Sequence, residues 1–157
     1  MPSEQSTVGW LRAGVLLLGG LGLVGTAAQL ALDRHWDSTE QLIPWVGVAL
    51  NIVAFGLVLR RPGTRRAFAA RGLAIVVFVI AAVGVWRHAN ANYEAGPLDR
   101  NYTDRWESMS ETDRWFRATV QSVGPAPTLA AGALAETALA VLIASMVVEP
   151  RMVRRSQ

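Results

Sequence analysis

The sequence predicts an all-α fold, a bundle of four transmembrane helices, and two observations support it. Apolar residues make up 52% of the 157-residue chain and are gathered into four blocks, whereas a soluble protein would disperse them along its helices and strands. The charges lie mostly between these blocks, and basic and acidic connections alternate. We therefore expect a single integral membrane domain over residues 1–157, with spans at about 8–32, 42–60, 68–88 and 127–148.

The first expected span, 8–32, contains a run of 20 residues without a charge, 13–32. A helix of that length is about 30 Å long, which matches the hydrocarbon core of a bilayer. Arg12 ahead of an apolar stretch, with small residues at 26–28, also fits a cleaved signal peptide. Because the apolar stretch is long for a signal peptide, we expect a permanent span.

The two middle spans differ in length. The second contains 18 uncharged residues, 42–59, and the third contains only 15, 72–86, between Arg71 and Arg87. Arginine side chains can reach from an apolar helix to the polar interface, so the third block is still long enough to cross. We expect its helix to continue inward over 67–70.

The fourth expected span covers 22 residues, 127–148, whose only charge is Glu136. Pro127 suits the first turn of a helix, where a backbone N–H is not needed. Pro150 suits a position just beyond the end of a helix, which it cannot continue. The pattern therefore predicts one uninterrupted helix between the two prolines.

The charges of the connections predict the orientation. The connection 60–71 holds five arginines and no acid, whereas 33–41 holds three acids and one arginine and 87–122 holds six acids and five arginines. Because arginine-rich connections stay in the cytoplasm, we expect a multi-pass protein of the cell (cytoplasmic) membrane with both termini and residues 60–71 inside. All 15 basic residues are arginine, a bias typical of a GC-rich bacterial genome.

The extracytoplasmic connection 89–126 is not expected to be an unstructured tether. Within 103–120, four apolar side chains fall on one side of a helix at 100° per residue. They are Trp106, Met109, Phe116 and Val120. The pattern predicts one or two short amphipathic helices that lie on the membrane or cover the end of the bundle.

A capping box is expected to start the second of these short helices. It is formed either by Ser108 with Glu111 or by Ser110 with Asp113. Trp115 lies opposite the main apolar side, so we expect it to be exposed and available to a partner protein.

Two polar side chains are expected in the middle of the membrane. Glu136 is the tenth residue of the fourth span and Asn51 is the tenth of the run 42–59, so they lie at similar depths. An ionised carboxylate facing lipid is costly, so Glu136 should face the bundle, be protonated or meet a partner. A hydrogen bond to Asn51 would hold helices together, and a proton or cation relay is the functional alternative.

His35 and His88 follow the first and third spans, so both are expected near the outer surface. Two imidazoles with an acid can bind a divalent metal, and two on facing helices can ligate a haem. Neither histidine lies in a recognised metal motif and each is next to an arginine, so we predict no metal and no cofactor. The absence of cysteine excludes disulfides and thiolate chemistry.

Several strings near the span ends resemble a known group of proteins. The strings His-Trp-Asp-Ser (35–38), Gln-Leu-Ile-Pro (41–44) and Asn-Tyr-Glu (92–94), with His88 and 124–132, resemble a group of small, uncharacterised bacterial four-helix integral membrane proteins. The resemblance implies the order of the spans and no activity. It directs attention to a polar cluster on the outer face. Its members are His35, Trp36, Ser38, Gln41, His88, Asn92 and Glu94.

The leading functional hypothesis is a non-catalytic accessory, assembly or interaction protein of the bacterial cytoplasmic membrane. Its partners would be lipid and either another membrane protein or a second copy of the chain. One alternative is a small oligomeric transporter or proton-coupled channel using Glu136 and Asn51, and another is a membrane redox, haem- or metal-binding protein using His35 and His88. No catalytic residue is predicted, which favours a non-enzyme. The arginines flank apolar spans, so nucleic acid is not expected as a partner.

Overall fold

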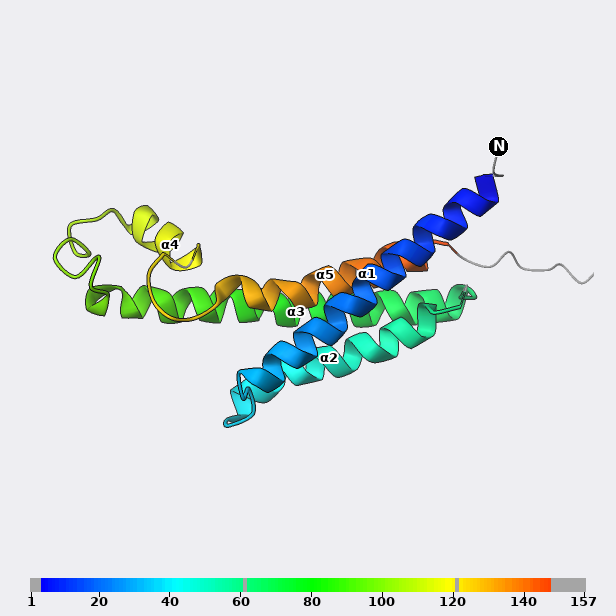
Figure 1. The fold of residues 1–157 in the computed structure, drawn as a ribbon, viewed down its shortest axis with the longest axis horizontal. Helices are drawn as coiled ribbons and strands as arrows, with labels where there is room; N and C mark the ends of the chain where they lie inside the picture. The colour runs from blue at the N-terminus through cyan, green and yellow to red at the C-terminus, as the bar shows by residue number, and fades with distance from the viewer. Residues whose placement is uncertain (1–3, 61, 121, 148–157) are drawn as a thin grey trace, which may run out of the picture.

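The computed structural model describes residues 4–60, 62–120 and 122–147, and within these residues every regular element is a helix. Three helices are long: α1 (Glu4–Leu32), α2 (Thr39–Val58) and α3 (Thr64–Ala95). They pack with the shorter α5 (Gly132–Ser145) into a bundle in which helices consecutive in the bundle run in opposite directions (Figure 1). The remaining elements are η1 (Gly96–Leu98), α4 (Glu111–Thr119) and η2 (Thr128–Ala131).

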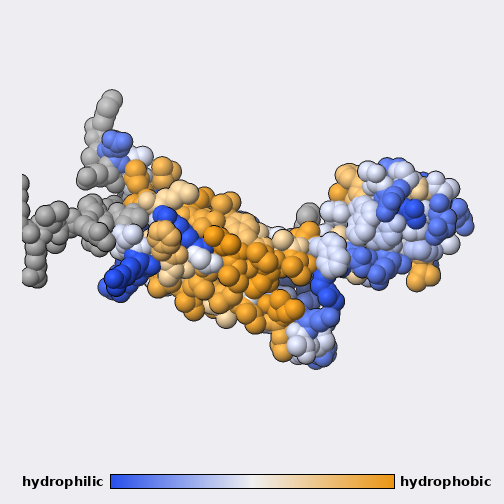
Figure 2. All heavy atoms as spheres, turned by 180° about the vertical axis from the view of Figure 1, so that it is seen from behind, coloured by the Kyte–Doolittle hydropathy of each residue, from blue (hydrophilic) through white to orange (hydrophobic). Residues whose placement is uncertain are grey.

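Three of the helical segments are long and apolar enough to cross a membrane, namely Ser6–Leu32, Thr39–Val58 and Thr64–Leu98. Large apolar side chains face outward on all of them, including Leu21 on α1 and Ile52 on α2. On the face that Figure 2 shows, these side chains form an apolar band in the middle of the molecule, with polar surface toward both ends. Such a surface matches an apolar solvent around the middle of the molecule.

The fourth apolar segment differs from the expected single helix over 127–148. Residues 128–131 form the 3-10 helix η2, and α5 begins at Gly132 and has 14 residues. The 3-10 turn η2 is held by a tertiary contact, because the Thr128 hydroxyl accepts a hydrogen bond from Asn92 of α3. The predicted end of the span, Val148, lies outside the described residues.

Close contacts join α5 and η2 to all three long helices, and a glycine lies at each contact. A Cβ atom on Gly19 of α1 would lie 2.5 Å from the Ala140 Cβ, and one on Gly84 of α3 would lie 3.0 Å from the Ala131 Cβ. Gly22 of α1 meets Thr137, and Gly47 of α2 meets Leu134. Small residues let helix backbones approach closely, so these positions bring α5 to the centre of the bundle.

One end of the bundle is closed by arginine side chains and is called the arginine end. The Arg12 guanidinium donates hydrogen bonds to the backbone carbonyls of Val58, Arg60 and Ala144. Arg71 donates to the hydroxyl and the carbonyl of Ser145, at 3.0 and 2.9 Å. The last carbonyls of a helix have no partner within it, so both arginines satisfy the ends of α2 and α5 and suit their negative dipole ends.

At the opposite end, the cap end, residues 99–126 fold back against the part of α3 that extends beyond the bundle (Figure 1). Trp106 is 1% exposed and packs edge-on against Tyr93 of α3, with ring centroids 5.5 Å apart. Tyr102 packs on Trp106 from the other side. Hydrogen bonding to Ser122, together with the nearby guanidinium groups of Arg117 and Arg105, lowers the pKa of the Tyr102 phenol.

The cap corrects the expected amphipathic arc. Only α4 is an α-helix in the described part of 99–126, and Trp106 lies in the turns before it. Phe116 is 64% exposed, and Trp115 is half-buried where it stacks on Tyr93 at 4.5 Å, so the expectation of an exposed Trp115 is wrong. The reason is that α3 continues to Ala95, past the expected end at residue 88, and presents Tyr93 as a packing surface.

The start of α4 agrees with one of the two expected capping pairs. The Ser110 hydroxyl accepts a hydrogen bond from the Asp113 N–H at 3.1 Å and donates one to the Asp113 carboxylate. Ser108 instead donates to the Arg105 carbonyl.

The glycine contacts give a matched test on one helix. We expect Gly19→Ala to lower the free energy of unfolding by about 1–3 kcal/mol, because the added methyl group overlaps Ala140 and Phe55. Gly14→Ala should be neutral or stabilising by up to about 1 kcal/mol, because nothing lies within 4 Å and alanine favours the helix. Thermal unfolding in mild detergent measures both. Equal effects at the two positions would refute the close approach of α1 and α5.

Candidate functional site

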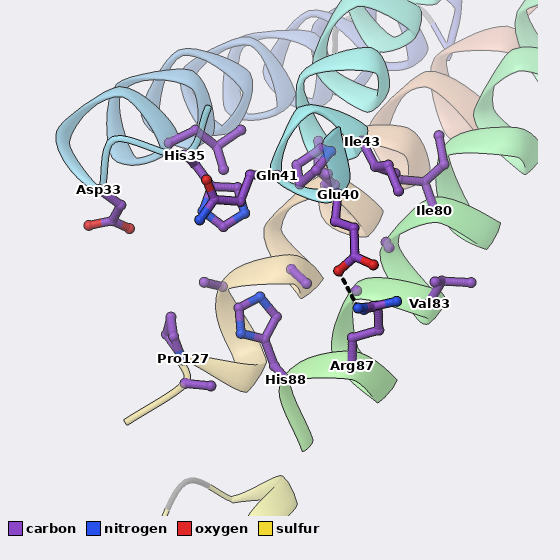
Figure 3. A pocket seen from close by; sticks show the side chains of 18 of the residues that line it. Asp33, His35, Glu40, Gln41, Ile43, Ile80, Val83, Arg87, His88 and Pro127 are labelled. Atoms are coloured by element: carbon purple, nitrogen blue, oxygen red, sulfur yellow. Dashed lines mark hydrogen bonds and ion pairs between the residues drawn. The ribbon is translucent and has the colours of Figure 1, made fainter. Parts of the chain in front are cut away.

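A cavity of about 700 Å³ lies at the cap end of the bundle. Its walls come from the end of α1 and the start of α2 on one side and from α3 and the segment 125–131 on the other (Figure 3). Helix ends that diverge leave space between them. The cavity in this space combines polar side chains with an apolar interior. It is called the cap-end cavity below.

A strained turn after α1 places His35 in the cavity. Arg34 has a φ of 50°, a left-handed conformation that is uncommon for residues other than glycine. The turn is closed by a hydrogen bond from the His35 N–H to the Leu30 carbonyl at 2.9 Å. The indole N–H of Trp45 in α2 donates to the His35 carbonyl at 2.8 Å. The position of His35 is therefore set by α1 and α2 together.

His88 enters the cavity from α3, and Figure 3 shows both imidazoles pointing into the same space. Both side chains are half-buried. Two imidazoles that share a cavity can donate or accept hydrogen bonds and exchange protons with a bound molecule. The sequence placed both histidines near the outer surface, and only the structure brings them together.

An ion pair crosses the mouth of the cavity beside the histidines. Arg87 of α3 contacts the Glu40 carboxylate in the first turn of α2, and both side chains are more than half exposed. Exposed ion pairs contribute little to stability, so its role is geometric: it links the outer ends of α2 and α3. Asp33 is the other acid that lines the cavity.

The N-terminal turn of α2 uses two more predicted residues. The Ser38 hydroxyl accepts a hydrogen bond from the Gln41 N–H at 3.3 Å, which caps the helix. The Gln41 side-chain carbonyl accepts one from the Asp37 N–H at 2.7 Å. Both side chains line the cavity while they hold its rim in place.

The interior of the cavity is apolar. Its apolar lining includes Leu30, Ile43, Ile80 and Leu134, one from each of α1, α2, α3 and α5. Ile43 is 42% exposed and Val83, also a lining residue, is 45% exposed, so the cavity is open at the surface. A polar rim over an apolar interior is the usual composition of a small-molecule site.

Asn92 holds the remaining wall. It is fully buried, and its amide nitrogen donates to the Ala118 carbonyl, the Ala126 carbonyl and the Thr128 hydroxyl at 2.8–3.1 Å. Its carbonyl oxygen accepts from the Ala126 N–H at 2.8 Å. Gly124 has a φ of 74° and packs against Asn92 so closely that a Cβ there would lie 2.4 Å from the Asn92 oxygen. Asn92 thus positions 125–127, which line the cavity.

The predicted outer-face cluster is therefore divided. Four of its seven members line the cavity: His35, Ser38, Gln41 and His88. Trp36 instead packs near Trp45, with ring centroids 6.5 Å apart, and Glu94 accepts a hydrogen bond from Asn90. Asn92 is a buried link between α3 and the cap. The helical continuation of α3 to Ala95 explains the part of the division that falls on α3. Asn92 lies one turn beyond His88 on the same face and so meets the cap, whereas Glu94 points to another side of the helix.

The expected neighbours in the middle of the bundle do not meet. Asn51 is fully buried and donates to the Thr137 hydroxyl at 2.5 Å and, more weakly, to the Leu134 carbonyl. Glu136 is exposed on the outer side of α5, and it has no hydrogen bond or ion pair among the described residues. A polar contact does join α2 and α5, but Thr137 forms it in place of the expected Glu136. The carbonyl oxygen of Asn51 is buried without a partner among the described residues.

Two sets of functional side chains were not identified from the sequence. One is the Arg87–Glu40 pair with Asp33 at the cavity, whose signal was the concentration of charges next to both histidines. The other is Arg12 and Arg71. In the sequence, arginines indicate the orientation in the membrane, whereas these two also donate hydrogen bonds to carbonyls at helix ends. Nothing in the residue pattern around them distinguishes these two roles.

Among the described residues, no group of three or more histidine and acidic side chains is placed to hold a metal ion. The two imidazoles alone fall short of the three protein ligands of a typical zinc site. The chemistry that the cavity does offer is hydrogen bonding to a partly apolar molecule. Comparison with models of known families, with curated proteins and with solved structures finds no match for this chain.

The Asn92 contacts give a second matched test. We expect Asn92→Ala to lower the local free energy of opening of the segment 118–128 by about 3 kcal/mol, because several buried backbone groups lose their partners. Hydrogen exchange at the Ala126 amide and tryptic cleavage after Arg117 report the opening. Asn90→Ala on the same helix removes only the bond to Glu94 and should leave both readouts unchanged. Equal protection in the two variants would contradict the role of Asn92.

Proposed function

We propose that the chain is a four-span integral protein of a bacterial cytoplasmic membrane, with both termini and the 60–71 connection on the cytoplasmic side. The three long apolar helices and the apolar band support insertion. The alternation of arginine-rich and acid-rich connections supports the orientation, with the arginine end inside.

The length of η2 and α5 supports a fourth crossing. Four residues at about 2.0 Å and fourteen at about 1.5 Å give roughly 29 Å, close to the thickness of the hydrocarbon core. Arg12 and Arg71 bind the carbonyls at the far end of α5, so that end reaches the level where arginine side chains meet polar surroundings.

We further propose that the protein is a non-catalytic accessory or assembly protein that binds another membrane protein through α5. The observation that carries this proposal is the exposure of Glu136 in the middle of the apolar band. It lies on an outward stripe with Leu139, Ile143 and Met146, all more than 40% exposed. A carboxyl group at that depth is costly against lipid, so the stripe favours a protein contact.

Charge complementarity points to a different protein as the partner. The described arginines nearest the band are engaged elsewhere: Arg12 and Arg71 bind carbonyls at the arginine end, and Arg87 pairs with Glu40 at the cap end. A second copy of this chain would therefore bring another acid to Glu136 and no cation. We infer that the partner presents a basic or amide side chain at mid-depth.

Cysteine labelling tests the topology, because the chain has no native cysteine. In intact cells, a membrane-impermeant maleimide should label Asp104→Cys and leave Gly63→Cys and Ser156→Cys unlabelled until the membrane is opened. Labelling of Ser156→Cys from outside would mean that η2 and α5 do not cross. Labelling of Gly63→Cys from outside would reverse the orientation.

Site-specific photo-crosslinking tests the partner. A crosslinking side chain at Leu139 should give one adduct whose partner peptide, identified by mass spectrometry, spans the membrane and carries a basic or amide residue. We expect Glu136→Leu to reduce the yield at least tenfold and Glu136→Gln, which still forms hydrogen bonds, to retain part of it. The control is the same crosslinker at Val79, which is 59% exposed on α3. An adduct unaffected by Glu136→Leu, or one between two copies of this chain, would refute the proposed partner.

A further inference from the structure

The cap-end cavity has the composition of a ligand site, and its polar groups limit what it can hold. The lining groups that can hydrogen-bond a neutral ligand include the two imidazoles and the Gln29 amide. The Ser38 and Gln41 acceptors are already used in the turn before α2, and the Thr26 hydroxyl donates to the Gly22 carbonyl. Among the described residues that line the cavity, Arg87 is the only arginine, and it is paired with Glu40. Gln29 is exposed, whereas both imidazoles are half-buried and point into the cavity, so a ligand inside it meets His35 and His88.

The charges at the rim disfavour an anionic head group. With the histidines neutral, the described part of the lining holds two carboxylates, Asp33 and Glu40, against the one guanidinium of Arg87. A phosphate would lack a free cation and would lie near an acid. A neutral group that carries carbonyl or hydroxyl oxygens has no such penalty and can accept or donate hydrogen bonds with both imidazoles.

The interior and the opening favour an apolar tail. Leu30, Ile80 and Leu134 form a floor that no polar head group would match. The exposed lining residues Ile43 and Val83 belong to α2 and α3, the two helices that the Arg87–Glu40 pair joins (Figure 3). A volume of about 700 Å³ lies within the range of small-molecule sites and holds a ring or glycerol head group with the first part of a chain.

We infer that the cap-end cavity binds a neutral amphiphile whose head group, bearing carbonyl or hydroxyl oxygens, is hydrogen-bonded between His35 and His88 while its tail lies on the apolar floor. Membrane quinones and diacylglycerols share this chemistry. The inference concerns binding and involves no reaction step. It is independent of the partner contact at Glu136, which lies on the outer side of α5.

Equilibrium binding to the full chain in phosphatidylcholine nanodiscs tests the inference. The probes are decylubiquinone, dioctanoylglycerol and the anionic dioctanoyl-phosphatidylglycerol. We expect saturable binding of at least one neutral probe and at least tenfold weaker binding of the anionic one. The stronger neutral probe identifies the source of the ligand. Tighter binding of the anionic probe, saturation by none of the three, or a haem absorbance band in the purified protein would overturn the inference.

Variants separate a hydrogen-bonded site from simple partitioning into the nanodisc. His35→Ala and His88→Ala should each raise the dissociation constant about tenfold, the loss expected for one buried hydrogen bond. His88→Gln, which keeps a donor and an acceptor, should restore part of the affinity. Asn90→Ala, on α3 at similar depth but outside the cavity, should bind as wild type does.

A cavity-filling variant keeps the test decisive if a histidine variant folds poorly. Val83→Trp narrows the cavity without removing a hydrogen bond and should weaken binding at least tenfold, while the melting temperature stays near that of wild type. Unchanged affinity in Val83→Trp together with unchanged affinity in His88→Gln and His88→Ala would place the probe outside the cavity and overturn the inference.

Discussion

Glycines set how closely the segment of η2 and α5 approaches the three long helices, and the rest of the bundle follows from that distance: Gly19 and Gly22 of α1 and Gly47 of α2 meet α5, and Gly84 of α3 meets η2. In a bilayer, helices gain little hydrophobic free energy by associating, so close packing and hydrogen bonds decide which faces meet. Thr137 takes part in close packing and in a hydrogen bond between helices. Its methyl group lies against Gly22 of α1, and its hydroxyl accepts the hydrogen bond from Asn51 of α2. One short side chain therefore joins three helices.

That same contact explains why Glu136 faces outward. Successive residues of a helix point about 100° apart, so a helix that turns Thr137 toward the centre turns Glu136 away from it. The partner proposed for Glu136 is thus a consequence of how α5 is rotated. Inside the bundle, the side-chain carbonyl oxygen of Asn51 is buried and has no hydrogen-bond partner among the described residues.

The two ends of the bundle are finished in different ways. At the arginine end, long side chains of α1 and α3 bind the last carbonyls of α2 and α5. At the cap end, α3 continues beyond its neighbours and carries the folded segment 99–126 (Figure 1). Asn92 ties that segment back toward η2, and the cap-end cavity lies between this wall and the turn after α1.

The sequence by itself determined the features that depend on local composition. These are the helical class, three of the long apolar segments and the position of both histidines near one end. A serine cap before the short helix was also expected, but the sequence left Ser108 and Ser110 as alternatives, and the structure selects Ser110. The tertiary structure decided the features that depend on the rotation and extension of helices. α5 is apolar on nearly every side, so its pattern did not indicate whether Glu136 or Thr137 faces inward. The continuation of α3 to Ala95 buried Asn92 and covered part of Trp115, and the turn at Arg34 brought His35 to His88. Contacts between distant segments set those positions.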